Sequence, residues 1–241
     1  MKPFLLLATR VVDLAADSEY DAMLRFGGLE APQLRRVRME QCPAGPIELD
    51  DYSGVILGGG PFNASDAEKE PVQVRVEAEI SALLDRIVAR DFPFLGACYG
   101  IGTLGTHQGA VVDRTYPEPV GPATITLTER GRADRLLGGL PDRFEAFLGH
   151  KEAITKLPAH AVHLASSAAC PVQAFRVGAN VYATQFHPEL DVPGIETRID
   201  VYRHAGYFEP HEAMTLKARA RASDVVHPPV ILRRFVELFA R

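Results

Sequence analysis

A cysteine between glycines is the residue in this sequence with the clearest chemical use. Cys98 lies in the run FLGACYG, residues 94–100, where an apolar strand pattern stops and a helical pattern begins. A nucleophile at the apex of so sharp a turn needs small neighbours, and Gly96 and Gly100 supply them. The N-terminus of the following helix favours a thiolate over a thiol. The segment predicts a nucleophilic Cys98, and the alternative is a small buried cysteine at an ordinary turn.

A histidine and a carboxylate two residues apart provide the other groups that a cysteine nucleophile needs. His187 and Glu189 follow the apolar run at 181–186 and flank Pro188. In an extended strand exit, residues two apart point to the same side, so these two side chains can share one face. The imidazole would act as general base and acid, while the carboxylate would fix its tautomer and stabilise the imidazolium. With Cys98 they form a candidate catalytic triad.

A glycine loop is the candidate for stabilising negative charge on a reacting carbonyl oxygen. Gly58, Gly59 and Gly60 follow the short apolar run at 55–57, and backbone N–H groups in such a loop can approach a substrate closely. We expect the N–H groups of Gly60 (or Gly59) and of Tyr99 to form an oxyanion hole. The alternatives are a simple turn or a phosphate loop, but no Gly-Lys-Ser/Thr sequence follows, as a phosphate loop requires.

The remaining cysteines and histidines show no comparable pattern. Cys42 and Cys170 each precede a proline outside any glycine elbow, so both are expected to be structural. No histidine spacing predicts a metal site, and no cofactor is expected. Five histidines are assigned to structural or surface positions: His160, His163, His204, His211 and His227.

The elements that must position these residues alternate in the first half of the chain and then change character. Short apolar runs alternating with amphipathic segments predict parallel strands joined by helices, an α/β fold with a doubly wound, mostly parallel sheet. We expect strands at 5–8, 34–39, 55–57 and 92–97 and helices at 18–26, 68–90 and 101–107. A β-rich middle predicts antiparallel or mixed strands at 123–128, 143–148, 163–166, 172–177 and 181–186. Helices are expected at 195–203, 210–221 and 229–240.

Bulk composition limits the classes of partner and the cellular compartment. The 241 residues, 46% of them hydrophobic and 24% charged, suit one globular domain at 1–241 with a helical extension at about 195–241. A net charge of -5 without a basic block argues against nucleic acid or a membrane as partner and favours a small polar substrate. Three cysteines and no export signal predict reduced thiols and a cytoplasmic location.

The three motifs together, in this order, resemble the class I (triad) glutamine amidotransferases, most closely the amidotransferase domain of GMP synthase and its stand-alone relatives. The resemblance covers roughly residues 50–190 and rests on GGGP at 58–61, GACYG at 96–100 and QFHPE at 185–189. It implies a doubly wound α/β fold, a γ-glutamyl thioester on Cys98 and release of ammonia from glutamine. It also implies that the ammonia passes to an acceptor enzyme.

Two departures from that family pattern concern the substrate. The family usually carries glutamine four residues after the cysteine, where this chain has Gly102, and Lys151 and Glu152 replace residues of a Ser-His-Gly-Asp-like segment. We therefore expect a glutaminase or amidotransferase acting on glutamine or a related γ-glutamyl amide, with any ATP-dependent synthetase on another chain. The alternatives are a γ-glutamyl conjugate hydrolase and a catalytically silent module that binds glutamine for regulation.

Overall fold

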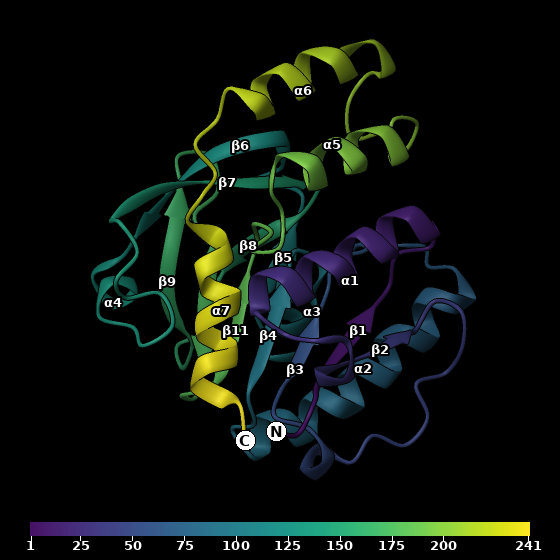
Figure 1. The fold of residues 1–241 in the computed structure, drawn as a ribbon, viewed down its shortest axis with the longest axis vertical. Coiled ribbons are helices and arrows are strands. Elements are labelled where there is room, and N and C mark those ends of the chain that lie inside the picture. Colours follow the sequence, from purple (N-terminus) through teal and green to yellow (C-terminus); the bar gives the residue numbers. More distant parts are fainter.

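The computed structural model describes residues 1–241 and places a nine-stranded sheet between helices on both of its faces (Figure 1). The strand order is β2-β1-β3-β4-β11-β10-β9-β6-β7. Its strands are β1 (Phe4–Ala8), β2 (Leu34–Arg38), β3 (Val55–Leu57), β4 (Phe94–Ala97), β6 (Glu118–Leu127), β7 (Arg143–His150), β9 (Val162–Ser167), β10 (Ala174–Val177) and β11 (Val181–Thr184). A separate antiparallel pair joins β5 (Val111–Asp113) to β8 (Ala153–Lys156). The predicted α/β class, with a large sheet and a small antiparallel one, is confirmed.

The sheet is parallel in one half and antiparallel in the other. β2, β1, β3, β4 and β11 run parallel to one another, whereas β10, β9, β6 and β7 continue the sheet with antiparallel pairing. The β-rich middle of the sequence therefore extends the same sheet. β5 and β8 were not predicted, because a strand of only three or four residues gives too short an alternation to recognise.

Alternating residues of the parallel strands pack against two helical layers. Leu6 and Ile56 face a cluster that includes α1 (Asp13–Gly27) and α7 (Pro228–Phe239). Leu5 and Leu57 face the opposite cluster, with α2 (Pro71–Ala89) and α3 (Tyr99–His107). Both sides of these strands are thus buried, which explains why they read as continuous apolar runs.

Helix limits differ from the sequence prediction mainly at the first helix. α1 begins at Asp13 instead of residue 18, because Ala15 and Ala16 add a buried first turn that lacks a strong apolar pattern. α2 carries its buried residues at helical spacing and begins at Pro71, whose missing N–H costs nothing in a first turn. The four-residue helix α4 (Glu129–Arg132) was not predicted.

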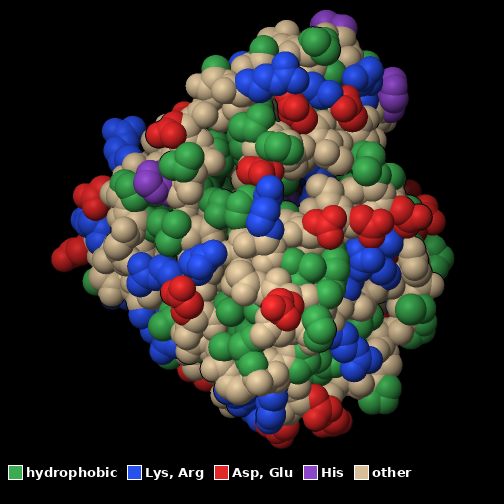
Figure 2. Space-filling view, in the orientation of Figure 1, with side chains coloured by type: hydrophobic (Ala, Val, Ile, Leu, Met, Phe, Trp, Pro, Cys, Tyr) green, Lys and Arg blue, Asp and Glu red, His purple; other side chains and the backbone are tan.

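The C-terminal helices lie in two places. α5 (Val192–Val201) and α6 (Ala213–Arg221) pack together beyond one end of the sheet, and α7 lies beside α1 on a sheet face (Figure 1). Basic side chains of α6 pair with acidic ones of α5, as Lys217 does with Asp200 at 2.6 Å. On the face in Figure 2, Lys and Arg side chains are interspersed with Asp and Glu. None of the helices has the length and apolar character needed to span a membrane.

Candidate active site

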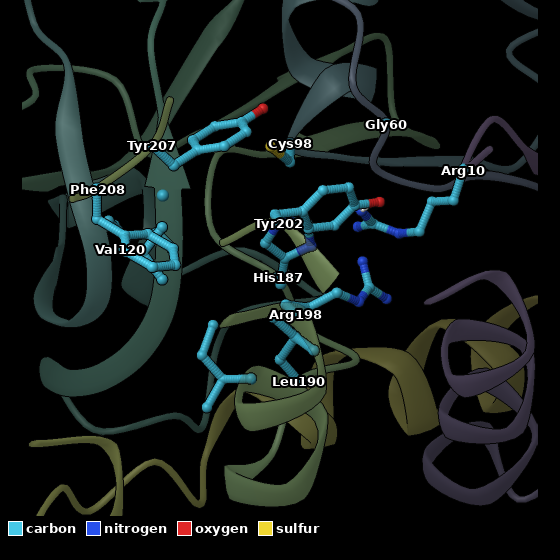
Figure 3. Close-up of a pocket in the computed structure, with 13 residues that line it drawn as sticks. Arg10, Gly60, Cys98, Val120, His187, Leu190, Arg198, Tyr202, Tyr207 and Phe208 are labelled. Carbon is cyan, nitrogen blue, oxygen red and sulfur yellow. Dashed lines mark hydrogen bonds between the residues drawn. The ribbon is translucent and has the colours of Figure 1, made fainter. Parts of the chain in front are cut away.

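The segments that carry the predicted catalytic residues leave the sheet side by side. β3 and β11 both pair in parallel with β4, on its two sides, so the three strands end at one edge. Sites of open α/β sheets form at this carboxyl edge, where successive loops converge. Cys98, His187 and Gly60 line one cavity there (Figure 3). The structure therefore brings together the groups that the three sequence motifs singled out.

Cys98 occupies a strained turn between β4 and α3. Its backbone has φ 53° and ψ -95°, a region that residues with side chains rarely adopt. The turn is tight because a Cβ placed on Gly96 would lie 2.9 Å from the backbone carbonyl of Gly100. The amide N–H of Cys98 donates to the carbonyl of Thr184 at 2.8 Å, which fastens the turn to the neighbouring strand. The thiol is thus held at the first turn of α3, partly open to the cavity.

His187 is held between a carboxylate and the thiol. Its Nδ1 lies 2.7 Å from Oε1 of Glu189, which is fully buried, so its other ring nitrogen, Nε2, is free to serve the sulfur. Burial disfavours the imidazolium, but the charge of Glu189 and the nearby Cys98 outweigh it and raise the pKa of His187 to about 10. The pKa of Glu189 is lowered because the neighbouring imidazolium overcomes the effect of burial. An imidazole oriented by a buried carboxylate thus lines the same cavity as the thiol.

Two further buried charges surround this pair, and sequence reasoning missed both. Nε of Arg10 donates to Oε1 of Glu19 at 2.8 Å, and Nη2 of Arg10 lies 4.0 Å from Oε1 of Glu189. Burial raises the pKa of Glu19, although Arg10 opposes the shift. The available signals were an arginine two residues after the buried strand β1 and a glutamate at a core position of α1, between Ala16 and Met23.

The glycine loop lies against the histidine and this arginine. A Cβ on Gly59 would be 2.5 Å from Nη2 of Arg10 and 2.7 Å from Cε1 of His187, so only glycine fits. No backbone or side-chain acceptor takes the N–H of Gly60 or of Tyr99, which begins α3. Gly60 borders the cavities whereas Gly59 does not, which favours Gly60 as the loop donor.

Two cavities meet at the thiol. Cys98, Gly60 and Tyr207 line both of them. One, of about 50 Å³, also has His187 in its wall, and the other, of about 20 Å³, has Tyr99. A single water needs about 10–15 Å³ on this scale, so each cavity is narrow. A substrate that reaches Cys98 can extend in two directions, towards His187 or towards the start of α3.

The departures at Gly102 and Glu152 are coupled in space. A Cβ on Gly102 would lie 2.8 Å from Oε1 of Glu152. The same carboxylate accepts backbone N–H bonds from Ala64 and Ser65, both at 2.8 Å, and so ties down the segment after the glycine loop. Glycine at 102 makes room for this carboxylate, so the two departures form one remodelled wall of the smaller cavity.

Lys151, the other departure from the family pattern, contacts the segment that carries the cavity-lining residue Tyr207. Its Nζ donates to the carbonyl of Ala205 at 3.0 Å and lies 4.5 Å from the ring centre of Tyr207. These contacts hold the segment between α5 and α6, which sequence reasoning did not connect with the site.

One buried cluster near the smaller cavity contains residue types that can ligate metals. Potential ligand atoms of Glu118, His150 and Cys170 lie within 4.8 Å of one another. Both nitrogens of His150 already have protein partners, the carbonyl of Glu152 at 2.8 Å and Oε2 of Glu118 at 2.9 Å. Burial raises the pKa of Cys170 to about 11, which disfavours the thiolate that a metal needs. The hydrogen bonds of His150 also connect β6 to the β7–β8 turn.

The chain is similar to known proteins both in family pattern and in sequence. Residues 29–196 match the family model described as glutamine amidotransferase class-I. A glutamine-hydrolyzing GMP synthase from Thermoplasma acidophilum, named as one subunit of that enzyme, is 33% identical over 146 residues, 60% of this chain and 66% of that protein. A glutamine-hydrolyzing GMP synthase from Aeropyrum pernix is 30% identical over 185 residues, 72% of this chain and 33% of that protein. The chain thus matches less than two thirds of the length of these curated relatives.

Solved structures with the same fold cover the whole chain. A glutamine amidotransferase from Thermotoga maritima superimposes with a TM-score of 0.80 at 20% identity, over 100% of both chains. A glutamine amido transferase from Methylobacillus flagellatus has a TM-score of 0.75 at 20% identity and covers 100% of this chain and 96% of that one. At these identities the likeness concerns the fold, including the C-terminal helices beyond the family match.

Proposed function

Because the chain belongs to the class-I glutamine amidotransferase family, we propose that it hydrolyses the side-chain amide of glutamine through a thioester on Cys98 and releases ammonia. The observation that carries this proposal is that Cys98 and His187 line one cavity while the buried Glu189 lies 2.7 Å from Nδ1 of His187 behind it. A thiol, a general base and an orienting carboxylate are the groups that nucleophilic amide cleavage needs.

In the proposed reaction His187 moves one proton in each direction. Its Nε2 takes the proton of the Cys98 thiol, and the sulfur attacks the amide carbon. When the tetrahedral intermediate collapses, the C–N bond breaks and Nε2 returns the proton to the leaving nitrogen, which departs as ammonia. Water, deprotonated by the same imidazole, then cleaves the thioester to give glutamate and the free thiol. Glu189 holds the imidazole in the tautomer that each step uses.

Negative charge on the carbonyl oxygen requires donors that are already in place. We assign this role to the backbone N–H groups of Gly60 and Tyr99, which make no other hydrogen bond. The N-terminal end of α3 adds a favourable field at the same point. Gly59 contributes by its lack of a side chain, which allows Arg10 and His187 to pack against the loop.

We also propose that the released ammonia is used by an acceptor enzyme on another chain. The Thermoplasma acidophilum relative is named as a subunit, which supports a division of labour between polypeptides. This chain has no phosphate-loop sequence that would bind ATP for an acceptor step.

An assay of ammonia and glutamate release from glutamine tests the proposal. We expect equal amounts of both products from the unmodified protein, loss of at least about a thousandfold in kcat/KM for Cys98→Ser and little change for the matched variant Cys42→Ser. Cys42 is an exposed cysteine away from both cavities. Turnover that survives in Cys98→Ser would contradict the proposed nucleophile.

A further inference from the structure

Arg198 of α5 is a buried cation without a hydrogen-bond acceptor. It is 5% exposed, and none of its guanidinium nitrogens has a partner. The nearest carboxylate oxygen, Oε1 of Glu19, is 3.7 Å from its Nη2 and already accepts from Arg10. Burying N–H donors without acceptors is costly, and it is most costly for a charged group. A ligand that brings an anionic acceptor would remove this cost.

The guanidinium group of Arg198 lies in the wall of the 50 Å³ cavity that also contains Cys98 and His187. Figure 3 shows the guanidinium groups of Arg198 and Arg10 pointing toward each other, with the ring of Tyr202 beside them. Nη1 of Arg10 is 3.3 Å from the hydroxyl of Tyr202. The cavity thus has a polar corner with two cations and a hydroxyl, which matches the hydrogen-bonding pattern of a carboxylate.

The rest of the cavity wall is apolar. Its apolar side chains are Val120, Leu148, Leu190, Ile195 and Phe208. At about 50 Å³ the cavity has room for a group of a few heavy atoms. A ligand that fills it combines a small aliphatic group with an anionic one.

The position of His187 identifies which part of a substrate enters this cavity. The imidazole must protonate the leaving nitrogen, so the leaving group lies on the side of the thiol where the imidazole lies. His187 lines this cavity and does not line the other, which has Tyr99 and Gln185 in its wall instead. Ammonia, the leaving group of glutamine, is a single heavy atom without negative charge. It uses neither the cations nor the apolar wall.

Resting on the proposed thioester chemistry, we propose that the substrates include γ-glutamyl amides of small apolar α-amino acids. The γ-glutamyl part extends from Cys98 towards Tyr99 on the side of the smaller cavity and beyond it, the α-carboxylate of the leaving amino acid binds Arg198, Arg10 and Tyr202, and its side chain contacts the apolar wall. The bond between the γ-carbon and the amino-acid nitrogen breaks while the thioester forms, and His187 gives the thiol proton to that nitrogen. Water then hydrolyses the thioester, so the products are glutamate and the free amino acid.

Part of this leaving-group site lies outside the family match. The match ends at residue 196, whereas Arg198, Tyr202, Tyr207 and Phe208 follow it. Lys151, which departs from the family pattern, holds this segment through Ala205 and Tyr207. Selectivity for the leaving group would therefore come from α5 and the segment that joins it to α6, separately from the triad.

A pair of substrates that differ only in the carboxylate tests this inference. γ-Glutamylvaline and γ-glutamylisobutylamine share the γ-glutamyl group and the branched alkyl chain. Only γ-glutamylvaline has a carboxylate on its leaving group. We expect kcat/KM for γ-glutamylvaline to exceed that for γ-glutamylisobutylamine by about tenfold or more, as a charge-assisted hydrogen bond to the leaving-group carboxylate implies. In Arg198→Met this ratio should fall to near one, and in Arg198→Lys it should be intermediate. Because the ratio is internal to each protein, a partial loss of folded or active enzyme cancels.

The exposed Arg219 of α6 provides the control variant, since Arg219→Met removes an arginine without touching the cavity and should keep the wild-type ratio. Equal kcat/KM for the two substrates in the wild type would overturn the proposed binding site for the leaving-group carboxylate. An unchanged kcat/KM ratio in Arg198→Met would do the same. In either case the proposed cysteine-dependent hydrolysis would still stand. Failure of the wild type to cleave either amide or glutamine would overturn the proposed function itself and this inference with it.

Discussion

The Nδ1 atom of His187 lies 2.7 Å from Oε1 of Glu189, only two residues further along the chain. Pro188 restricts the link between them, and both side chains are buried. Because this charge pair is close and buried, the pKa of His187 is raised and that of Glu189 is lowered. The nearby Cys98 also raises the pKa of His187. The relationship therefore has consequences that can be measured in solution.

The pKa of His187 should depend on its carboxylate neighbour. Since the charge of Glu189 helps to raise that pKa to about 10, Glu189→Gln should lower it, and titration of the imidazole Cε1 proton by NMR would show the change. A pKa raised from 6.5 contributes stability that is fully present below pH 6.5 and is lost as pH rises through about 10. The free energy of unfolding should thus fall over that window in the wild type, by at most about 1.4 kcal/mol per pH unit, and fall less in Glu189→Gln.

The exposed Glu237 gives the matched control, because Glu237→Gln removes a carboxylate far from the imidazole. Its titration curve and its pH profile of unfolding should follow those of the wild type. An imidazole that titrates near pH 6.5 in the unmodified protein would show that the ion pair is not formed.

The elbow should not tolerate a side chain at Gly96. A methyl group there would lie 2.9 Å from the carbonyl carbon and oxygen of Gly100, and backbone atoms in a buried turn cannot move aside cheaply. We expect Gly96→Ala to lower the free energy of unfolding by about 1–3 kcal/mol or more, as measured by urea denaturation. Gly27→Ala is the control, since its nearest contacts are side-chain atoms of Leu29 and Val236 at 3.3 Å and beyond. A Gly96→Ala protein as stable as Gly27→Ala would contradict the tight turn.

Gly102 and Glu152 should behave as a coupled pair. Gly102→Ala would push the carboxylate of Glu152 away from the N–H groups of Ala64 and Ser65, at a cost of about 1–3 kcal/mol for donors left without an acceptor. Since Glu152→Ala already removes those bonds, the double variant should be less destabilised than the two single variants predict together. Additive free energies of unfolding in this double-mutant cycle would show that the two positions do not interact.

Much of the fold and of the site geometry follows from local sequence patterns. Parallel strands buried on both faces read as short apolar runs, and the glycines around Cys98 mark a turn that tolerates no side chains. In an extended segment the two-residue spacing of His187 and Glu189 places both side chains on the same side. These features depend on neighbours in sequence, so a reader of the sequence can recognise them.

What the sequence did not reveal depends on contacts between distant segments. Glu19 sits among apolar residues of α1, and only the fold shows that Arg10 and Arg198 lie beside it. Likewise, Lys151 and Tyr207 are more than 50 positions apart, and only the fold shows that Lys151 packs on Tyr207 at the roof of the cavity. Roles for such residues cannot be read from spacing, because no local pattern encodes their partners.

Covalent capture of Cys98 tests its role as the nucleophile most directly. We would treat the Cys42→Ser protein, which lacks the exposed cysteine, with a glutamine-analogue electrophile and locate adducts by peptide mass spectrometry. Cys170 is buried, and its pKa is raised to about 11, so it should not react. We predict a single adduct on Cys98 that excess glutamine suppresses and that Cys98→Ser abolishes. An adduct elsewhere, or an unlabelled Cys98, would contradict the account.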